Sequence, residues 1–341
     1  MPPYRLRAAA AATLLAVGLA GCSSGGDRPA PAPSGTPAGA ASAAPGGASA
    51  GPGGAASAAP TGRVPAGHAP SRSFPVGVRD LRVNRDDRAL PVTIWYPRSG
   101  TAAGPEATPR RGARAASGRF PVVLFSHGLG ARPADYQRLL AGWAAAGFVV
   151  AAPTYPNTSR GAQLDVLDVL NQPADASYAL TAVLRLDGRA GDPLSGHLAT
   201  DRVAAAGHSA GGVTTVGLFT ADRDARLDAG IVLAGSALGV GTGYAGPAAP
   251  LLFVHGERDN VVSYASGKAA YDAVPWPKAL LSLPNGDHGG ALLRRGNPAF
   301  PPVEDSTVDF LRWSLYGDAA ALRRLPRDAT RGGLADLDDR L

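Results

Sequence analysis

Residues 202–221 read RVAAAGHSAGGVTTVGLFTA, and they indicate the fold class more directly than the rest of the chain. The stretch opens with a short apolar run of strand length and closes with residues that favour a helix. Between the two lies Gly207-His-Ser209-Ala-Gly211, the pattern G-x-S-x-G. A serine in this pattern at a strand-to-helix turn is typical of a nucleophile exposed above a sheet. The stretch therefore predicts an α/β domain in which Ser209 is the nucleophile.

The two glycines that flank the serine have a steric reason. A backbone that turns this sharply brings its flanking residues against neighbouring main chain, where a side chain would clash. Glycine at positions 207 and 211 removes the clash, and the amino end of the following helix favours developing negative charge. The alternative interpretation is that Ser209 only caps the helix among closely packed glycines.

Strand and helix patterns alternate on both sides of this turn. Such alternation predicts a mostly parallel sheet covered by helices on both faces. The first two strands have no helix between them, so we expect them to form an antiparallel edge. The predicted strands are 76–83, 91–97, 121–126, 148–152, 202–207, 231–234, 251–254 and 279–283. The predicted helices include 133–146, 164–186, whose helical pattern is broken near Pro173, and 303–316.

A nucleophilic serine needs a general base, and the chain has six histidines. Four of them lie in the N-terminal region, at the ends of apolar strands or directly beside Ser209. The other two are His197, which precedes the strand of the nucleophile, and His288, which follows the strand over 279–283. Loops at the carboxyl ends of parallel strands meet at one edge of a sheet, where sites form. This favours His288 as the base, with His197 as the alternative.

The acid that orients the base is expected after another strand. The apolar run 251–254 leads into His-Gly-Glu-Arg-Asp259, which puts a carboxylate just past a strand end. Asp259 would accept the Nδ1 proton of His288 and hold the ring in the required tautomer. Glu257 and Asp287 are close by in the sequence and stay open as alternatives.

Backbone donors for a negatively charged oxygen are predicted after an earlier strand. Ser-His-Gly-Leu129-Gly follows the apolar run of 121–126, and its small residues let a backbone N–H face the site. We predict that the N–H groups of Leu129 and Ala210 are the two donors. The sequence has no metal-ligand cluster, phosphate-binding loop or dinucleotide fingerprint, so we predict no cofactor and no metal.

Four segments together resemble the α/β-hydrolase superfamily, namely 125–131, 207–212, 256–259 and 287–288. The most similar branch holds platelet-activating-factor acetylhydrolase-like, dienelactone hydrolase-like and polyester hydrolase-like proteins. The resemblance covers 74–316 and implies Ser209 as nucleophile, Asp259 as acid and His288 as base, in the chain order usual for the superfamily. It also implies Leu129 and Ala210 as the oxyanion donors and a structural role for Asp175. The serine departs from dienelactone hydrolases proper, which use a cysteine.

The resemblance also bears on the substrate. Lids in this fold usually enter between the sixth and seventh strands, where 235–250 is too short for a cap domain. We therefore expect an open site for small or lipid-like esters, walled by Tyr155, Trp276 and the Leu129 side chain. The alternative for Tyr155 and Trp276 is ordinary packing.

The N-terminal 22 residues predict an exported lipoprotein. Two arginines precede an apolar run of about a dozen residues, and a bilayer span takes about 20. Leu19-Ala-Gly-Cys22 then resembles a bacterial lipobox, which implies removal of residues 1–21 and a lipid on Cys22. Cys22 is the only cysteine, so no intramolecular disulfide is possible. We expect the protein on the outer face of a bacterial membrane, the alternative being a cleaved signal with an incidental cysteine.

Composition divides the rest of the chain. From 23 to 73, 43 of 51 residues are Ala, Gly, Pro or Ser, which cannot bury enough apolar surface to fold. We therefore predict a tether over 22–73, a catalytic domain over 74–316 and a C-terminal tail over 317–341. Five of the 33 basic and one of the 27 acidic residues precede position 74, which leaves a net charge of +2 on the remainder. This excludes a nucleic-acid partner, and we expect a monomer.

The function predicted from the sequence is a serine hydrolase that cleaves carboxylic esters through an acyl-enzyme. Its partners would be the ester and, through Cys22, the membrane. The alternatives are a lipase or polyester hydrolase, a peptidase or amidase with the same three residues, and a tethered binding module without catalysis.

Overall fold

The computed structural model describes residues 67–101 and 108–341 of the chain. The predicted signal peptide, Cys22 and most of the predicted tether lie outside the described residues, so they stay predictions. Within the described part, no helix combines the length and apolarity that a membrane crossing requires.

Ten strands of the described residues join in one sheet, and two more form a separate hairpin. The strands are β1 (Val76–Leu81), β2 (Asn84–Arg85), β3 (Arg88–Ala89), β4 (Val92–Pro97), β5 (Arg110–Arg111), β6 (Phe120–Ser126), β7 (Val149–Pro153), β8 (Leu198–His208), β9 (Leu227–Leu233), β10 (Leu251–Gly256), β11 (Lys278–Leu283) and β12 (Asp336–Arg340). The order across the sheet is β12-β11-β10-β9-β8-β6-β7-β4-β1-β5, and β2 pairs with β3.

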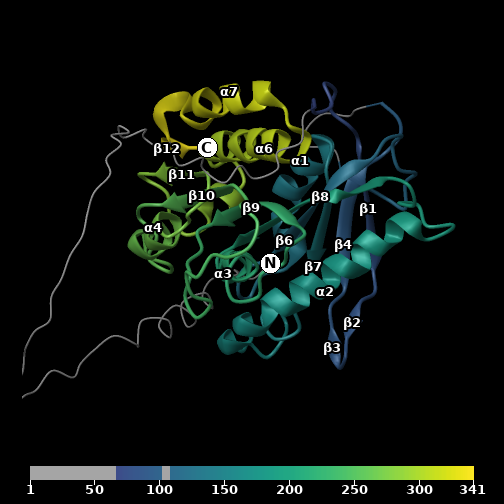
Figure 1. Cartoon of the computed structure of the whole chain (residues 1–341), viewed down its shortest axis with the longest axis horizontal. Helices are drawn as coiled ribbons and strands as arrows, with labels where there is room; N and C mark the ends of the chain where they lie inside the picture. Colours follow the sequence, from purple (N-terminus) through teal and green to yellow (C-terminus); the bar gives the residue numbers. More distant parts are fainter. Residues whose placement is uncertain (1–66, 102–107) are drawn as a thin grey trace, which may run out of the picture. The chain divides into compact units, whose positions relative to one another are not determined.

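Helices lie on both faces of this sheet (Figure 1). The α-helices are α1 (Gln137–Ala145), α2 (Gln172–Leu184), α3 (Ala210–Gly217), α4 (Tyr264–Asp272), α5 (Gly290–Leu293), α6 (Phe300–Tyr316) and α7 (Ala319–Ala329). Short 3₁₀ turns are η1 (Pro133–Tyr136), η2 (Val166–Asn171), η3 (Arg185–Gly188) and η4 (Arg331–Gly333). In the view of Figure 1, α1, α6 and α7 lie above the sheet, whereas α2 and α3 lie below it.

The central strands are apolar throughout because both of their faces are covered. All seven residues of β6 are buried. Phe120, Val122 and Leu124 belong to the core that contains residues of α2, α3 and α4. Val123 and Phe125 belong to the second core, with residues of α1, α6 and α7. Successive side chains of a strand point to opposite faces, so one apolar run fills two cores.

The sequence-based fold class is confirmed: the sheet is mostly parallel and has the arrangement of the α/β-hydrolase fold. β11, β10, β9, β8, β6 and β7 run parallel to one another. β4 is antiparallel to β7 and β1 is antiparallel to β4, as expected for the first two strands. We call the end of the sheet where the six parallel strands finish the carboxyl edge, and the end where they start the amino edge.

The predicted helix over 164–186 begins later than expected. Residues up to Asn171 form the 3₁₀ turn η2, and α2 starts at Gln172 with Pro173 in its first turn. Proline has no N–H to donate inside a helix but is tolerated in the first turn, where that group has no partner. The proline therefore marks a helix start.

The chain after Tyr316 continues the fold, although the sequence analysis separates it as a tail. α6 ends at Gly317 in the left-handed conformation (φ 73°), and the Asp318 side chain then accepts from the first N–H groups of α7. β12 completes the sheet by pairing antiparallel with β11. Its sequence is DLDDR, and such charged residues suit a strand at the edge of a sheet. Because the sequence has no alternation of apolar and polar residues, the pattern alone does not predict this strand.

Candidate active site

Ser209 stands in a strained turn between β8 and α3. Its backbone has φ 57° and ψ −120°, a conformation that costs energy in any residue with a side chain. A Cβ on Gly207 would lie 2.0 Å from the carbonyl oxygen of Gly211, and a Cβ on Gly211 would lie 2.0 Å from that of Ser126. Both glycines are therefore required by close backbone approach, which is the steric reason given for the pattern.

Three predicted residues come together at the carboxyl edge. The Oγ of Ser209, after β8, lies 2.7 Å from Nε2 of His288, after β11. The Nδ1 of His288 lies 2.7 Å from Oδ2 of Asp259, after β10. These are hydrogen-bond distances, so the hydroxyl, the ring and the carboxylate form one continuous chain. A serine is thus paired with a base, and the base with an acid that orients it.

The Asp259 carboxylate is held in place from several sides. Its Oδ1 accepts the backbone N–H groups of Val261 (2.8 Å) and Val262 (2.9 Å). On the other oxygen, the Nε2 of buried His255 approaches to 3.3 Å while donating to the Val262 carbonyl. Burial by itself would raise the pKa of Asp259, but hydrogen bonds from His255 and His288 hold it well below the usual range. The acid is therefore ionised and fixed in orientation.

The alternative acids, Glu257 and Asp287, and the alternative base, His197, do not take part in this chain of hydrogen bonds. Glu257 is exposed, and Asp287 instead accepts the N–H of Gly290 (2.7 Å). His197 precedes β8 at the amino edge, where its Nδ1 bonds the carbonyl of Gly118 (3.0 Å). The geometry therefore favours Asp259 over both carboxylates and His288 over His197.

The backbone N–H groups of Leu129 and Ala210 lie near Ser209, and neither has a protein acceptor among the hydrogen bonds of the described residues. Their neighbours are satisfied: Gly128 N–H donates to the Tyr136 hydroxyl (3.1 Å) and Gly130 N–H to the Thr158 carbonyl (2.7 Å). Free donors beside a nucleophile suit an oxygen that becomes negative during acyl transfer. This pattern favours the two donors expected from the sequence.

Two buried residues that the sequence analysis did not select, Tyr136 and His208, connect the loops of the site. The Nε2 of His208 lies 2.7 Å from the His288 carbonyl, and its Nδ1 lies 2.9 Å from the Tyr136 hydroxyl. A carbonyl can only accept, so Nε2 carries the proton and Nδ1 accepts from Tyr136, which in turn accepts from Gly128. One chain of hydrogen bonds thus joins the Leu129 loop, the turn of Ser209 and the His288 loop.

Burial keeps this connecting histidine neutral. It lowers the pKa of His208 to about 4, and it likewise lowers the pKa of His127 to about 4. His127 Nε2 accepts the backbone N–H of Tyr155 (3.1 Å), and its Nδ1 bonds the carbonyl of Gly128 (2.9 Å). Both rings have a single tautomer set by backbone partners. The only signal in the sequence for these roles is position: His208 directly precedes Ser209, and His127 lies two residues before Leu129.

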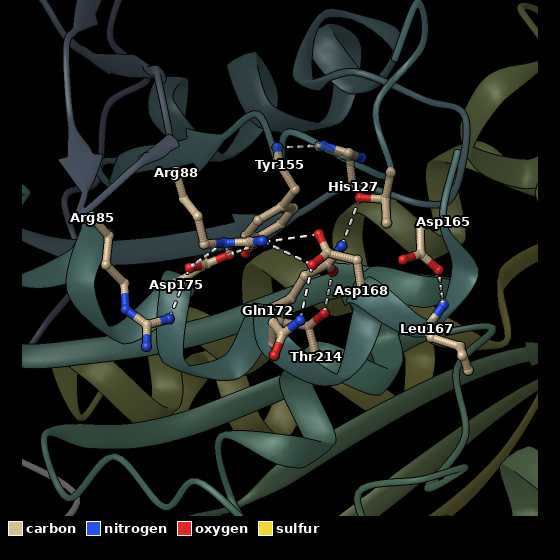
Figure 2. A network of polar contacts seen from close by, with 12 residues as sticks. Arg85, Arg88, His127, Tyr155, Asp165, Leu167, Asp168, Gln172, Asp175 and Thr214 are labelled. Atoms are coloured by element: carbon tan, nitrogen blue, oxygen red, sulfur yellow. Dashed lines mark hydrogen bonds and ion pairs between the residues drawn. The ribbon is translucent and has the colours of Figure 1, made fainter. Parts of the chain in front are cut away.

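A charged network ties the β2–β3 hairpin to η2 and α2 (Figure 2). Arg88 forms ion pairs with Asp168 (2.8 Å) and Asp175 (2.6 Å), and Arg85 pairs with Asp175 (2.9 Å). Both carboxylates are buried, so the two arginines supply the charge that balances them. Asp175 thus has the structural role that the resemblance implies.

Gln172, next to this network in α2, links two parts of the site (Figure 2). Its Nε2 donates to the Thr158 hydroxyl (2.6 Å), and its Oε1 accepts from the Thr214 hydroxyl in α3 (2.7 Å). The Thr158 carbonyl in turn accepts the N–H of Gly130. The segment that follows β7 is therefore tied both to the Leu129 loop and to the helix that begins after Ser209.

The prediction that Tyr155 and Trp276 line the substrate pocket is wrong. Tyr155 is fully buried and its hydroxyl bonds Ser126 (2.8 Å), so it cannot touch a substrate. Trp276 is also buried, packs edge-on against Tyr244, and precedes β11 at the amino edge. Aromatic character was the only signal for both, and it does not distinguish a pocket wall from a core residue.

Within the described ranges, no group of three or more His, Cys, Asp or Glu side chains could hold a metal ion. At the carboxyl edge, Ser209, His288, Asp259 and nearby backbone N–H groups have positions in which they could act as nucleophile, base, orienting acid and oxyanion donors. That set is sufficient for nucleophilic acyl transfer.

Comparison with family models finds the Chlorophyllase family, an α/β-hydrolase-like esterase family, matched by residues 109–237. The matched stretch contains the Leu129 loop and Ser209, and it ends before Asp259 and His288. No curated protein matches the chain. Fold and family match agree with the superfamily to which the sequence motifs were assigned.

Proposed function

We propose that the protein is a serine hydrolase of carboxylic esters from the α/β-hydrolase superfamily, with which its fold is consistent. The observation that carries the proposal is the hydrogen-bonded chain from Ser209 Oγ through His288 to Asp259. The Chlorophyllase-family match independently supports an esterase-type function.

In the first half of the reaction, Ser209 Oγ attacks the ester carbonyl carbon while His288 Nε2 takes the hydroxyl proton. The ring becomes positively charged, and Asp259 stabilises it through the Nδ1–H hydrogen bond. The carbonyl oxygen becomes negative and accepts from the N–H groups of Leu129 and Ala210. The C–O bond to the leaving alcohol then breaks, and His288 returns the proton to that oxygen.

In the second half, water takes the place of the alcohol. His288 Nε2 accepts a proton from the water as its oxygen attacks the acyl carbon bound to Ser209 Oγ. The same two N–H groups stabilise the second negative oxygen. When the bond to Oγ breaks, His288 protonates Ser209, which releases the acid and regenerates the enzyme.

Ester turnover by the full chain and its Ser209→Ala variant tests the proposal. p-Nitrophenyl esters from acetate to palmitate cover the range of acyl lengths. We expect the variant to lose turnover by about 10⁴-fold or more, as for other serine nucleophiles. Ser73→Ala, an exposed serine beside the amino edge, is the matched control and should keep full activity. Equal rates for wild type and Ser209→Ala would refute the proposal.

The same assay ranks the alternatives. Turnover of peptide or aryl amides exceeding that of esters would point to a peptidase or amidase. A folded wild-type protein without Ser209-dependent turnover on any ester or amide would point to a binding module.

We also propose that the protein is exported and carries a lipid on Cys22. The lipobox-like Leu19-Ala-Gly-Cys22 supports this assignment. Labelling of cells with an alkyne analogue of palmitate should mark the wild type and not Cys22→Ser. Equal labelling of both proteins, or of neither, would contradict a lipid on Cys22.

A further inference from the structure

Large apolar side chains at the surface are concentrated at the carboxyl edge. In the described part of the chain, nine such side chains are exposed. Seven of them follow the carboxyl ends of β7, β9, β10 and β11, and we call these seven the apolar rim. Its members are Leu164, Val166, Leu167, Leu170, Leu238, Val261 and Leu293. Single exposed apolar residues are normal in proteins, whereas a group at one edge indicates an interaction surface.

The apolar rim lies on both sides of Ser209. β8, which leads to Ser209, has β9, β10 and β11 on one side, where Leu238, Val261 and Leu293 follow them. On the other side lie β6 and then β7, and four rim residues follow β7. Whatever covers the rim therefore also covers the opening to the nucleophile.

Two rim residues, Leu164 and Leu293, contact the loops of the site directly. Leu164 lies 3.8 Å from the position of a Cβ on Gly130, next to Leu129, and Leu293 lies 3.1 Å from that of Gly289, next to His288. Leu293 also lines a cavity of about 290 Å³ beside His288. The rim is thus continuous with the place where an ester would react.

Two arginines on this face pair with carboxylates of the protein itself. Arg160 pairs with Asp135 (2.7 Å), and Arg294 pairs with Asp287. The most exposed rim residues are Leu167 (70%) and Leu238 (60%). These exposed apolar side chains favour contact with an apolar surface.

The N-terminal segment joins the domain at the opposite edge. Pro70 packs against Gly147, just before β7 begins, and the N–H of Phe74 donates to the Ala145 carbonyl (2.8 Å). The chain that leads to Cys22 therefore leaves from the amino edge.

We propose that the apolar rim is a docking surface for aggregated, uncharged fatty-acyl esters, such as a glyceride droplet. The proposal rests on the proposed ester hydrolysis at Ser209 and names the physical state of its substrate. Contact with the droplet buries the rim, and the hydrophobic effect favours that contact. The face that binds the droplet is the face that opens onto Ser209, so docking brings ester groups to the nucleophile.

The test compares dissolved and aggregated esters with the full chain. The double variant Leu167→Ser/Leu238→Ser removes the two most exposed members of the rim. Tyr178→Ser is the matched control, because Tyr178 is 45% exposed on α2 and its neighbour Ser177 bonds Asp224, just before β9 at the amino edge. Each protein is assayed on dissolved p-nitrophenyl butyrate and on a tributyrin emulsion, and thermal melting confirms that it folds.

We expect the double variant to lose about tenfold on the emulsion, equivalent to about 1.4 kcal/mol of binding, while its rate on the dissolved ester stays within about twofold. Tyr178→Ser should match the wild type on both. Three outcomes would overturn the proposal. They are equal loss on both substrates, no loss on the emulsion, and a change of oligomeric state in the double variant, which would make the rim an interface between copies.

Droplet binding without catalysis separates this proposal from the proposed function. Ser209→Ala should co-float with tributyrin droplets as the wild type does, and the same variant with both rim substitutions should not. If Ser209→Ala keeps turnover, the catalytic assignment fails. If Ser209→Ala and its rim-substituted form bind droplets equally, the docking surface fails.

Discussion

Two polar networks support the site from different sides, and they differ in charge. The network of Tyr136 and His208 is neutral and runs through the centre of the site, from the Leu129 loop to the His288 loop. The network of Arg88 is ionic and ties the β2–β3 hairpin to η2 and α2. In the neutral network each atom has one possible role as donor or acceptor, which fixes orientation. The ionic network instead balances buried charge, so its loss should affect stability more than geometry.

The largest expected effect is that of breaking the ionic network. Arg88→Ala leaves the buried carboxylates of Asp168 and Asp175 without their main partner, since Arg85 reaches only Asp175. We expect a loss of about 3–5 kcal/mol in the free energy of unfolding. Urea denaturation measures it.

Arg85→Ala is the control for that substitution. Arg85 is one-third exposed and makes a single ion pair, so we expect a loss of about 1 kcal/mol or less. If Arg88→Ala and Arg85→Ala lowered the free energy of unfolding equally, Arg88 would not be the main partner of the two buried carboxylates.

A smaller effect on stability, with a larger one on catalysis, is expected from the neutral network. Tyr136→Phe preserves the ring but leaves Gly128 N–H and His208 Nδ1 without their partner. Unsatisfied buried groups cost about 1–3 kcal/mol. We expect kcat on p-nitrophenyl butyrate to fall about tenfold with KM little changed, because reacting groups are misoriented after the ester binds.

Tyr244→Phe removes a half-buried tyrosine hydroxyl away from the site and should leave kcat unchanged. That hydroxyl makes one long bond, to the Ala270 carbonyl (3.3 Å). If Tyr136→Phe had the same kcat as Tyr244→Phe, the proposed orienting role would be wrong.

A further expected effect is a dependence of stability on pH, and it also separates the two networks. The pKa of His208 and that of His127 are about 4 in the folded protein, below the value of about 6.5 expected when unfolded. Between these values the unfolded chain binds more protons, so stability falls as the pH falls from about 6.5 to about 4. Each histidine contributes a slope of up to about 1.4 kcal/mol per pH unit.

Carboxylates of the ionic network respond at lower pH. Burial opposes ionisation of Asp168, but hydrogen bonds from Arg88 and Asn171 lower its pKa below the usual value. Its contribution is present above the unfolded pKa and is lost only as the pH falls through the lowered one. Denaturation curves at pH 7, 5.5 and 4 should therefore show a slope that His208→Asn reduces. An unchanged slope in that variant would contradict the neutral, buried state of His208.

Much of the fold could be predicted because local sequence patterns determine the strands and helices, and the parallel direction of the strands determines which loops meet. The apolar run of β6 reads as a buried strand whatever its partners are, and G-x-S-x-G marks a turn whose glycines are required by backbone contacts within a few ångströms. Ser209, Asp259 and His288 could be selected in the same way, since each follows a strand and parallel strands finish at one edge. Their roles in catalysis stay predictions until the variants are assayed.

The tertiary structure decided what depends on contacts between distant segments. β12 has no apolar pattern and becomes a strand only because β11 offers it an unpaired edge. Tyr155 and Trp276 have the composition of pocket walls, yet packing buries both. Tyr136 and His208 lie 72 residues apart and meet through a hydrogen bond that neither sequence neighbourhood specifies. Local periodicity and turn chemistry are properties of a short stretch of sequence, whereas burial and hydrogen-bond partners are set when the whole chain packs. The sequence by itself therefore determined the turn that carries Ser209, and only the tertiary structure determined which residues hold that turn in place.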